Sequence, residues 1–182
     1  MYKLLLVLAM LRGMPLAVAG PSEGDLFGYR LGSKYPVTDS TKGYFWPFMG
    51  SMVVVADKPE KSDDFKKVEL IATPKTFTIA NIYGVAEVAT EKEAKAMAAR
   101  YSDLLQTLHA AKCHSEKAYL GEALKLLCGG QYELTVSHYP PDKNEKNYKV
   151  HVGLKFSNDA EGGKRILTQG HLEKLPLWAA VR

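Results

Sequence analysis

The chain has 182 residues, of which 46% are hydrophobic, and this share argues against an intrinsically disordered protein. Its 24 Lys and Arg residues are interleaved with 20 Asp and Glu residues, so the sequence offers no basic stripe and we expect no nucleic-acid partner. No segment beyond the N-terminus is apolar for about 18 residues, which argues against a transmembrane helix.

Residues 1–19 have the pattern of a secretory signal peptide. Lys3 supplies an early positive charge, residues 4–11 form an unbroken apolar run, and Ala17 and Ala19 provide small side chains before the expected cleavage point. The apolar run is much shorter than the about 20 residues that a membrane-spanning helix needs. An ordinary N-terminal apolar helix is the alternative interpretation.

Cleavage before Gly20 would release residues 20–182 as the mature chain. Because the leader contains two of the basic residues and no acidic residue, the remainder carries 22 basic and 20 acidic side chains, a net charge of +2. A chain of this length can bury the core of one globular domain. We therefore expect a single domain that works in the periplasm or outside the cell, with no stable membrane insertion after the leader is removed.

The mature chain is predicted to begin with a short strand, or an entry segment packed on the core, over residues 26–32, and residues 43–49 then form the densest aromatic segment of the chain. Aromatic side chains are frequent anchors of protein interfaces, and the proline at position 47 favours a place at a sheet edge. The alternative is that these aromatic side chains fill the core. The candidate partner-binding residues are Tyr44, Phe45, Trp46 and Phe48.

Three further strands are predicted before the first helix. Residues 52–56 are apolar and rich in β-branched side chains, which is typical of a buried strand. Residues 65–72 alternate between apolar and charged side chains, and residues 76–88 resume as a strand after a short segment that contains Pro74. Because proline presets a turn conformation, the last two segments are predicted to pair as a hairpin.

Two helices are predicted in the middle of the chain. Thr90 and Glu93 have the spacing of an N-terminal capping box, and apolar residues recur at helical spacing behind them over residues 91–111. We interpret this apolar stripe as core packing rather than as a cofactor site. A second helix is predicted over residues 118–127, which end at a pair of glycines that is typical of a helix C-terminus.

The two cysteines, Cys113 and Cys128, are expected to form a disulfide in an exported protein. A straight helix between them would hold their Cα atoms about 20 Å apart, whereas a disulfide needs them within about 7 Å. The bond therefore requires residues 113–117 to run extended. A free, reactive pair formed by Cys113 and His114 is the alternative.

The C-terminal half adds two strands and a helix. Strands are predicted at residues 131–139 and 148–156, and the loop between them is a second candidate surface. A helical pattern after residue 160 is weakened by three glycines, each of which costs up to about 1 kcal/mol in a helix. The predicted order ββββ–αα–ββ–α gives an α+β fold, an antiparallel sheet of about five to six strands with helices packed on one face.

The sequence contains no strong catalytic, metal or nucleotide motif, so we assign no catalytic residue, metal or cofactor. His138 and His151 lie on strands predicted to pair, but the apolar pattern places Val136 and Val150 on one face, which puts the two histidines on opposite faces. His109 is expected to be a boundary residue of the first helix.

By elimination, we expect an exported, non-enzymatic binding protein that caps or inhibits a partner protein. An immunity protein against a delivered toxin, or an inhibitor of an envelope hydrolase, fits the size, the leader and the lack of a catalytic motif. The alternatives are a small periplasmic hydrolase with dispersed catalytic residues and an envelope assembly factor. A hydrolase should show a cleft in which titratable groups converge, whereas an assembly factor should expose a long sheet edge or a large apolar patch.

Overall fold

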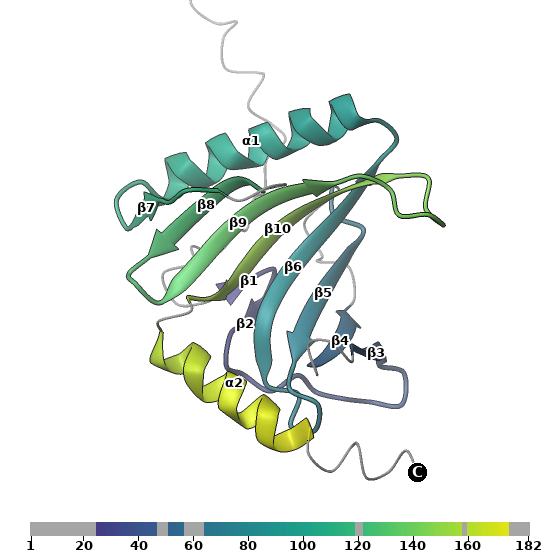
Figure 1. Ribbon diagram of the computed structural model, residues 1–182, viewed down its shortest axis with the longest axis vertical. Coiled ribbons are helices and arrows are strands. Elements are labelled where there is room, and N and C mark those ends of the chain that lie inside the picture. Colours follow the sequence, from purple (N-terminus) through teal and green to yellow (C-terminus); the bar gives the residue numbers. More distant parts are fainter. Residues whose placement is uncertain (1–24, 47–50, 57–63, 119–121, 158–159, 175–182) are drawn as a thin grey trace, which may run out of the picture.

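The computed structural model describes residues 25–46, 51–56, 64–118, 122–157 and 160–174, so the expected leader lies outside the described residues. Within this part the chain is α+β, with two antiparallel sheets and two helices (Figure 1). In chain order the elements are β1 (Asp25–Leu26), β2 (Tyr29–Arg30), β3 (Lys42–Trp46), β4 (Ser51–Ala56), β5 (Lys67–Ala72), β6 (Ile79–Val88), α1 (Glu91–His109), β7 (Cys113–Ser115), β8 (Glu122–Cys128), β9 (Tyr132–Tyr139), β10 (Tyr148–Phe156) and α2 (Glu161–Lys174).

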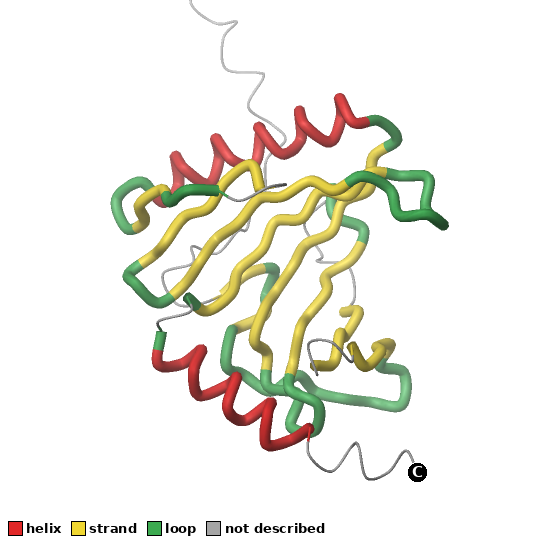
Figure 2. Tube along the Cα trace, in the orientation of Figure 1, coloured by secondary structure: helices red, strands yellow, loops and turns green. Residues whose placement is uncertain are grey.

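The large sheet has eight strands in the order β3-β4-β5-β6-β10-β9-β8-β7, and β1 and β2 pair separately. It consists of two meanders that meet where β6 pairs with β10, and Figure 2 shows the turns that join β5 to β6, β8 to β9 and β9 to β10. α1 carries the chain from β6 in the middle of the sheet to β7 at its edge. Its 19 residues span about 28 Å, which is enough to cross β10, β9 and β8 at about 4.8 Å per strand.

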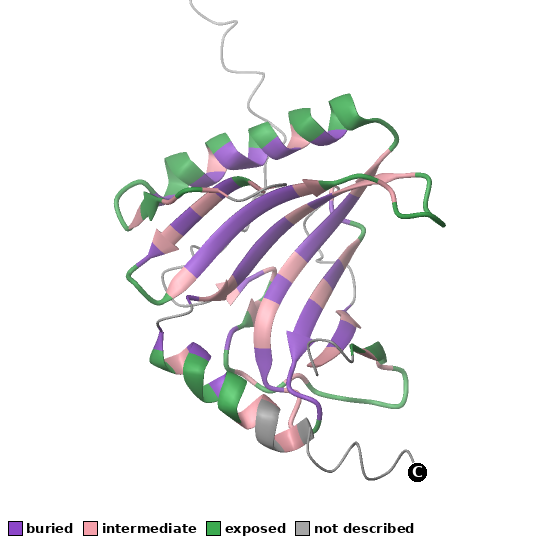
Figure 3. Cartoon of the chain, in the orientation of Figure 1, coloured by how far each residue is buried: buried purple, intermediate pink, exposed green. Residues whose placement is uncertain are grey.

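The main core lies between α1 and one face of the sheet, which we call the core face. This face carries the even-numbered residues of the central strands, including Leu134, Val136 and Val152, which are buried as predicted. Figure 3 shows α1 buried along the side that faces the sheet and exposed on the other side. The buried residues of α1 in this core are Ala94, Ala98, Tyr101 and Leu105.

The opposite face of the sheet, which we call the polar face, carries the odd-numbered residues of the same strands. Glu133 is buried there, and the ammonium groups of Lys155 and Lys125 lie 3.0 Å and 3.5 Å from its carboxylate. The Tyr83 ring covers Gly153, where a Cβ would lie 2.5 Å from two ring carbons. The polar face also carries Lys67, Glu69, Glu87, Thr135, Ser137, Lys149 and His151.

α1 begins where the capping-box pattern predicts. The Thr90 hydroxyl accepts a hydrogen bond from the backbone N–H of Glu93 at 3.2 Å, and the Glu93 carboxylate accepts one from the backbone N–H of Thr90 at 3.0 Å. Each end of this reciprocal pair satisfies a backbone donor that the first turn of a helix leaves unpaired. The predicted hairpin of β5 and β6 and the C-terminal helix are also confirmed.

The predicted second helix is wrong, because residues 122–128 form the strand β8. Leu124, Leu126 and Cys128 alternate onto the core face, so the period of two prevails over the helical spacing. The two glycines that follow adopt positive φ values of 58° and 68° and form a tight hairpin turn rather than a helix cap. The sheet therefore has more strands than predicted, and β3 and β7 at its two edges account for two of them.

The carboxylate of Glu173 fastens α2 to the turn between β5 and β6. It accepts hydrogen bonds from the backbone N–H groups of Lys75 and Thr76, at 2.8 and 3.1 Å, from the Thr76 hydroxyl at 2.6 Å, and from the Gln169 amide at 2.8 Å. Partial burial acts to raise the pKa of Glu173, but these hydrogen bonds outweigh it and lower the pKa to about 2. The ionised carboxylate thus sets the position of α2 at the end of the sheet.

No helix among the described residues combines the length and the apolar character needed to cross a bilayer.

Candidate functional site: an aromatic edge strand

β3 forms one edge of the large sheet and pairs with β4 alone among the described strands. Its side chains alternate between the two faces, as they do in any strand. Tyr44 lies opposite Val53 and Trp46 lies opposite Ser51, so both aromatic side chains project from the polar face. The exposed fractions are 55% for Tyr44 and 39% for Trp46. The sequence segment around Pro47 thus supplies two large, solvent-accessible aromatic side chains at a sheet edge.

The four aromatic residues predicted as one site do not all lie together. Tyr44 and Trp46 share the polar face, whereas Phe45 lies opposite Met52 on the core face and is half-buried. Phe48 lies outside the described residues. Alternation along β3 is the physical reason for the division, because neighbouring residues of a strand point to opposite faces.

Two buried apolar residues that the sequence analysis did not assign to this site extend the aromatic edge inward. Val53 lies beside Tyr44, and Ile71 on β5 lies beside Val53, so the three form a row across three strands of the polar face. Val53 and Ile71 are buried but do not belong to the main core cluster. The signal for them is the run of apolar residues in β4, where both alternating sets of side chains are apolar.

A charged pair borders this apolar row. The ammonium group of Lys67 lies 2.8 Å from the Glu69 carboxylate. Burial acts to lower the pKa of Lys67, but the hydrogen bond and the charge of Glu69 leave the pKa raised overall. Lys67 is therefore charged, and the edge combines an aromatic and apolar strip with a fixed ion pair. This combination of aromatic side chains and a polar border is typical of protein interfaces.

The centre of the polar face holds His151 between two tyrosines. Its ring centroid lies 5.0 Å from that of Tyr139 and 6.0 Å from that of Tyr83. Burial lowers the pKa of His151, so the imidazole is neutral near pH 7. Ser137 lies opposite His151 in the strand register, yet no hydrogen bond joins the two among the described residues. Among the described residues, His151 and Ser137 are therefore not joined as a base and a nucleophile.

Two further histidines, His138 and His109, lie on other elements than His151. His138 pairs with Val150 on the core face, so His138 and His151 lie on opposite faces as predicted. His109 is buried, with 6% of its surface exposed, and not at a boundary as expected. Burial lowers the pKa of His109. The expected boundary position is wrong because His109 lies one helical turn after Leu105, on the buried side of α1.

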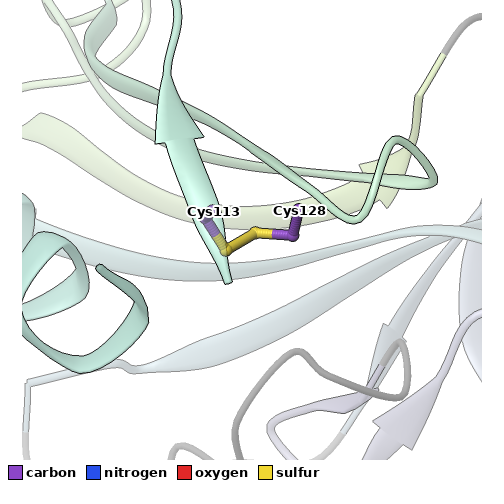
Figure 4. Close-up of a disulfide and its surroundings, with 2 residues drawn as sticks. All are labelled: Cys113 and Cys128. Atoms are coloured by element: carbon purple, nitrogen blue, oxygen red, sulfur yellow. A yellow bond between two sulfur atoms is a disulfide. The ribbon is translucent and has the colours of Figure 1, made fainter. Parts of the chain in front are cut away.

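The expected disulfide is present between Cys113 and Cys128 (Figure 4). The two residues face each other in the register of β7 and β8, with their Cα atoms 4.1 Å apart. Both sulfurs are committed to this bond, so the alternative of a free Cys113 paired with His114 is wrong. The bond ties the three-residue edge strand β7 to its neighbour.

No group of three or more His, Cys, Asp or Glu side chains in the described part of the chain is placed to hold a metal ion. Comparisons with protein-family models, with curated proteins and with solved structures gave no match.

Proposed function

We propose that this chain is an exported, non-enzymatic binding protein that captures a partner protein at the aromatic edge formed by Tyr44 and Trp46. Binding at this edge would cap or inhibit the partner, as an immunity protein or an inhibitor of an envelope hydrolase does. The observation that carries the proposal is the exposure of both aromatic side chains on an edge strand. Tryptophan and tyrosine are enriched among the few interface residues that contribute most of the binding free energy.

The edge supplies two kinds of recognition. An edge strand presents backbone N–H and C=O groups to which an extended partner segment can add as a further strand. The side chains of Tyr44 and Trp46 would then fix the register, since they can enter apolar pockets of the partner. Export is supported by the Cys113–Cys128 disulfide, because disulfides persist in oxidising compartments.

The polar face supports binding over catalysis. Its charges are already compensated within the fold: Glu133 by Lys155, Glu69 by Lys67, and Glu87 by Lys66 at 3.3 Å.

The test is to isolate the partner from an envelope extract and to measure its affinity for purified variants. Replacing Tyr44 and Trp46 together by alanine should weaken binding by about 30-fold or more, as expected for the loss of an interface anchor. Leu167→Ala is the matched control, because this leucine is 68% exposed and belongs to α2 rather than to β3 or its partner β4. A folded double variant that binds the partner as tightly as the wild type would contradict the proposal.

Two further measurements separate the proposal from its alternatives. An inhibitor or immunity protein should suppress the activity of its purified partner at a one-to-one ratio, whereas an assembly factor should release the partner when its complex is complete. N-terminal sequencing of the exported protein should begin at Gly20, and a product that begins at Met1 and stays in the cytoplasm would contradict export.

A further inference from the structure

A cavity of about 250 Å³ lies between α2 and the segment that follows β2. It is separate from the aromatic edge, because its wall includes Phe156, whose register partner is Tyr132 on the core face. The residues that line it come from four parts of the chain: Gly32, Lys34, Thr78, Phe156, Gly162, Arg165, Ile166 and Gln169.

The hydrogen bonds of the surrounding backbone hold the walls of this cavity in place. The Gly32 N–H donates to the Ile79 carbonyl at 2.8 Å, and the Ile79 N–H donates to the Ser33 carbonyl at 2.8 Å. Lys34 and Thr78 form a further bridge between the same two segments. These bonds hold the segment after β2 against the beginning of β6.

α2 forms the opposite wall and approaches Phe156 closely. A Cβ at Gly162 would lie 2.8 Å from a ring carbon of Phe156, so the glycine allows the helix to contact the ring. Ile166, one turn further along, is buried and adds to the same apolar wall. Gln169 donates a hydrogen bond to the Thr76 hydroxyl at 2.6 Å, which fastens the helix in this position.

The charges around the cavity are unbalanced. Lys34 and Arg165 line it from opposite walls, and neither forms an ion pair with a carboxylate of the described residues. The nearby carboxylate of Glu173 is committed to the turn between β5 and β6 by four hydrogen bonds. The cavity therefore combines two positive side chains that form no ion pair among the described residues with an apolar wall and the Thr78 hydroxyl.

We propose that this cavity binds a small organic anion, with a carboxylate or phosphate group between Lys34 and Arg165 and an apolar body against Phe156 and Ile166. A guanidinium group presents two parallel N–H donors that match either anion, and an ammonium group adds a point charge. The volume is below the about 300–1,000 Å³ of typical ligand pockets, so the ligand is small. The proposal does not depend on the partner protein that we assign to the aromatic edge.

The experiment titrates the exported protein with four probes and follows binding by calorimetry and NMR. The probes are hexanoate and phenyl phosphate, which carry an apolar body and differ in the anion, inorganic phosphate, which has no apolar body, and hexanamide, which has no charge. We expect hexanoate or phenyl phosphate to bind with a Kd in the range of about 1 mM or below, and the stronger of the two identifies the anion. Inorganic phosphate and hexanamide should bind at least about tenfold more weakly.

Three variants test the residues. Arg165→Gln and Lys34→Gln should each weaken the best probe by about tenfold or more, and Arg165→Lys should restore part of the loss. Lys164→Gln is the matched control, because Lys164 is an exposed cation on the same helix that does not line the cavity. Both Gln variants change exposed residues, so thermal unfolding should be nearly unchanged.

Several outcomes would overturn the proposal. Hexanamide binding as tightly as hexanoate would show that the charges have no role, and inorganic phosphate binding as tightly as phenyl phosphate would show that the apolar wall has none. An equal loss in Lys164→Gln would reveal non-specific attraction to the charge of α2. The absence of binding by all four probes at about 10 mM would also refute it.

Discussion

Replacing Glu173 by glutamine should loosen α2 from the sheet, because glutamine keeps the shape of the side chain but cannot accept hydrogen bonds at both terminal atoms. In the wild type each carboxylate oxygen accepts two of the four hydrogen bonds. In the variant the terminal NH₂ group would face either two backbone N–H donors or the Gln169 amide and the Thr76 hydroxyl, so one or two hydrogen bonds are lost and a donor–donor repulsion is added. Hydrogen bonds to charged groups are worth about 1.5–3 kcal/mol each when buried, and solvent exposure at this site reduces the figure.

The lowered pKa of Glu173 gives a second value for the free energy that its hydrogen bonds contribute to stability. A shift from 4.5 to about 2 would correspond to about 3 kcal/mol without solvent screening. Because this carboxylate is partly exposed, we discount the figure to about 1–2 kcal/mol. For a protein of this size, that loss should lower the melting temperature by about 2–8 °C. Glu161→Gln, an exposed change in the first turn of α2, is the control and should have a smaller effect.

The pH dependence separates this explanation from a general weakening of α2. The pKa of Glu173 is lower in the folded state than in the unfolded state, so its contribution is present above about pH 4.5 and disappears as the pH falls toward about 2. Urea denaturation of wild type and Glu173→Gln should therefore give free energies of unfolding that differ at neutral pH and converge over this interval. Equal stabilities at neutral pH, or a gap that persists at the lowest pH at which both proteins fold, would refute the reasoning.

Two further predictions concern stability. Tyr101→Phe removes the hydrogen bond that the tyrosine hydroxyl donates to Asp64 and should lower the free energy of unfolding by about 1 kcal/mol in a denaturant titration. Because burial and this hydrogen bond raise the pKa of Tyr101, the wild type should also lose stability as the pH rises above about 10. The same alkaline loss in Tyr101→Phe would contradict this explanation. Reduction of the Cys113–Cys128 disulfide, which spans 15 residues, should lower the free energy of unfolding by about 3 kcal/mol, whereas a variant with serine at both positions should not respond to the reductant.

The elements with strong local signals could be predicted from the sequence. α1 combines a capping box with a long helical repeat, and both act through contacts within the element itself. β10 has a clear alternation of apolar and polar residues, and its bounds, Tyr148–Phe156, agree with the prediction. In such segments the local preference and the tertiary contacts favour the same structure.

β8 shows why the local signal can mislead. Leucine and alanine recur there at spacings of three and four, but Leu124, Leu126 and Cys128 also alternate, and a short apolar segment fits both periods. The segment forms a strand because it pairs with β9, which is a tertiary contact. The disulfide indicates a strand at this position, because a strand pair places Cys113 directly opposite Cys128, whereas a straight helix would hold the two cysteines apart.

The two proposed sites differ in how far the sequence could reveal them. The aromatic edge is visible as a segment, but which of its side chains are exposed follows only from the pairing of β3 with β4. The cavity has no local signal, since Lys34 and Arg165 are far apart in the chain and meet only through the packing of α2.

The sheet itself makes the two sites independent. Tyr44 and Trp46 project from the polar face, whereas the cavity is built around Phe156 on the core face. A substitution of the exposed aromatic side chains therefore leaves the cavity wall intact, and Arg165→Gln leaves β3 unchanged. Additive effects are expected for positions that share no partner. The backbone of β5 and β6, joined by the turn that Glu173 holds, is one physical connection between the two sites. If the anion altered the affinity for the partner protein through this connection, Glu173→Gln should weaken the effect.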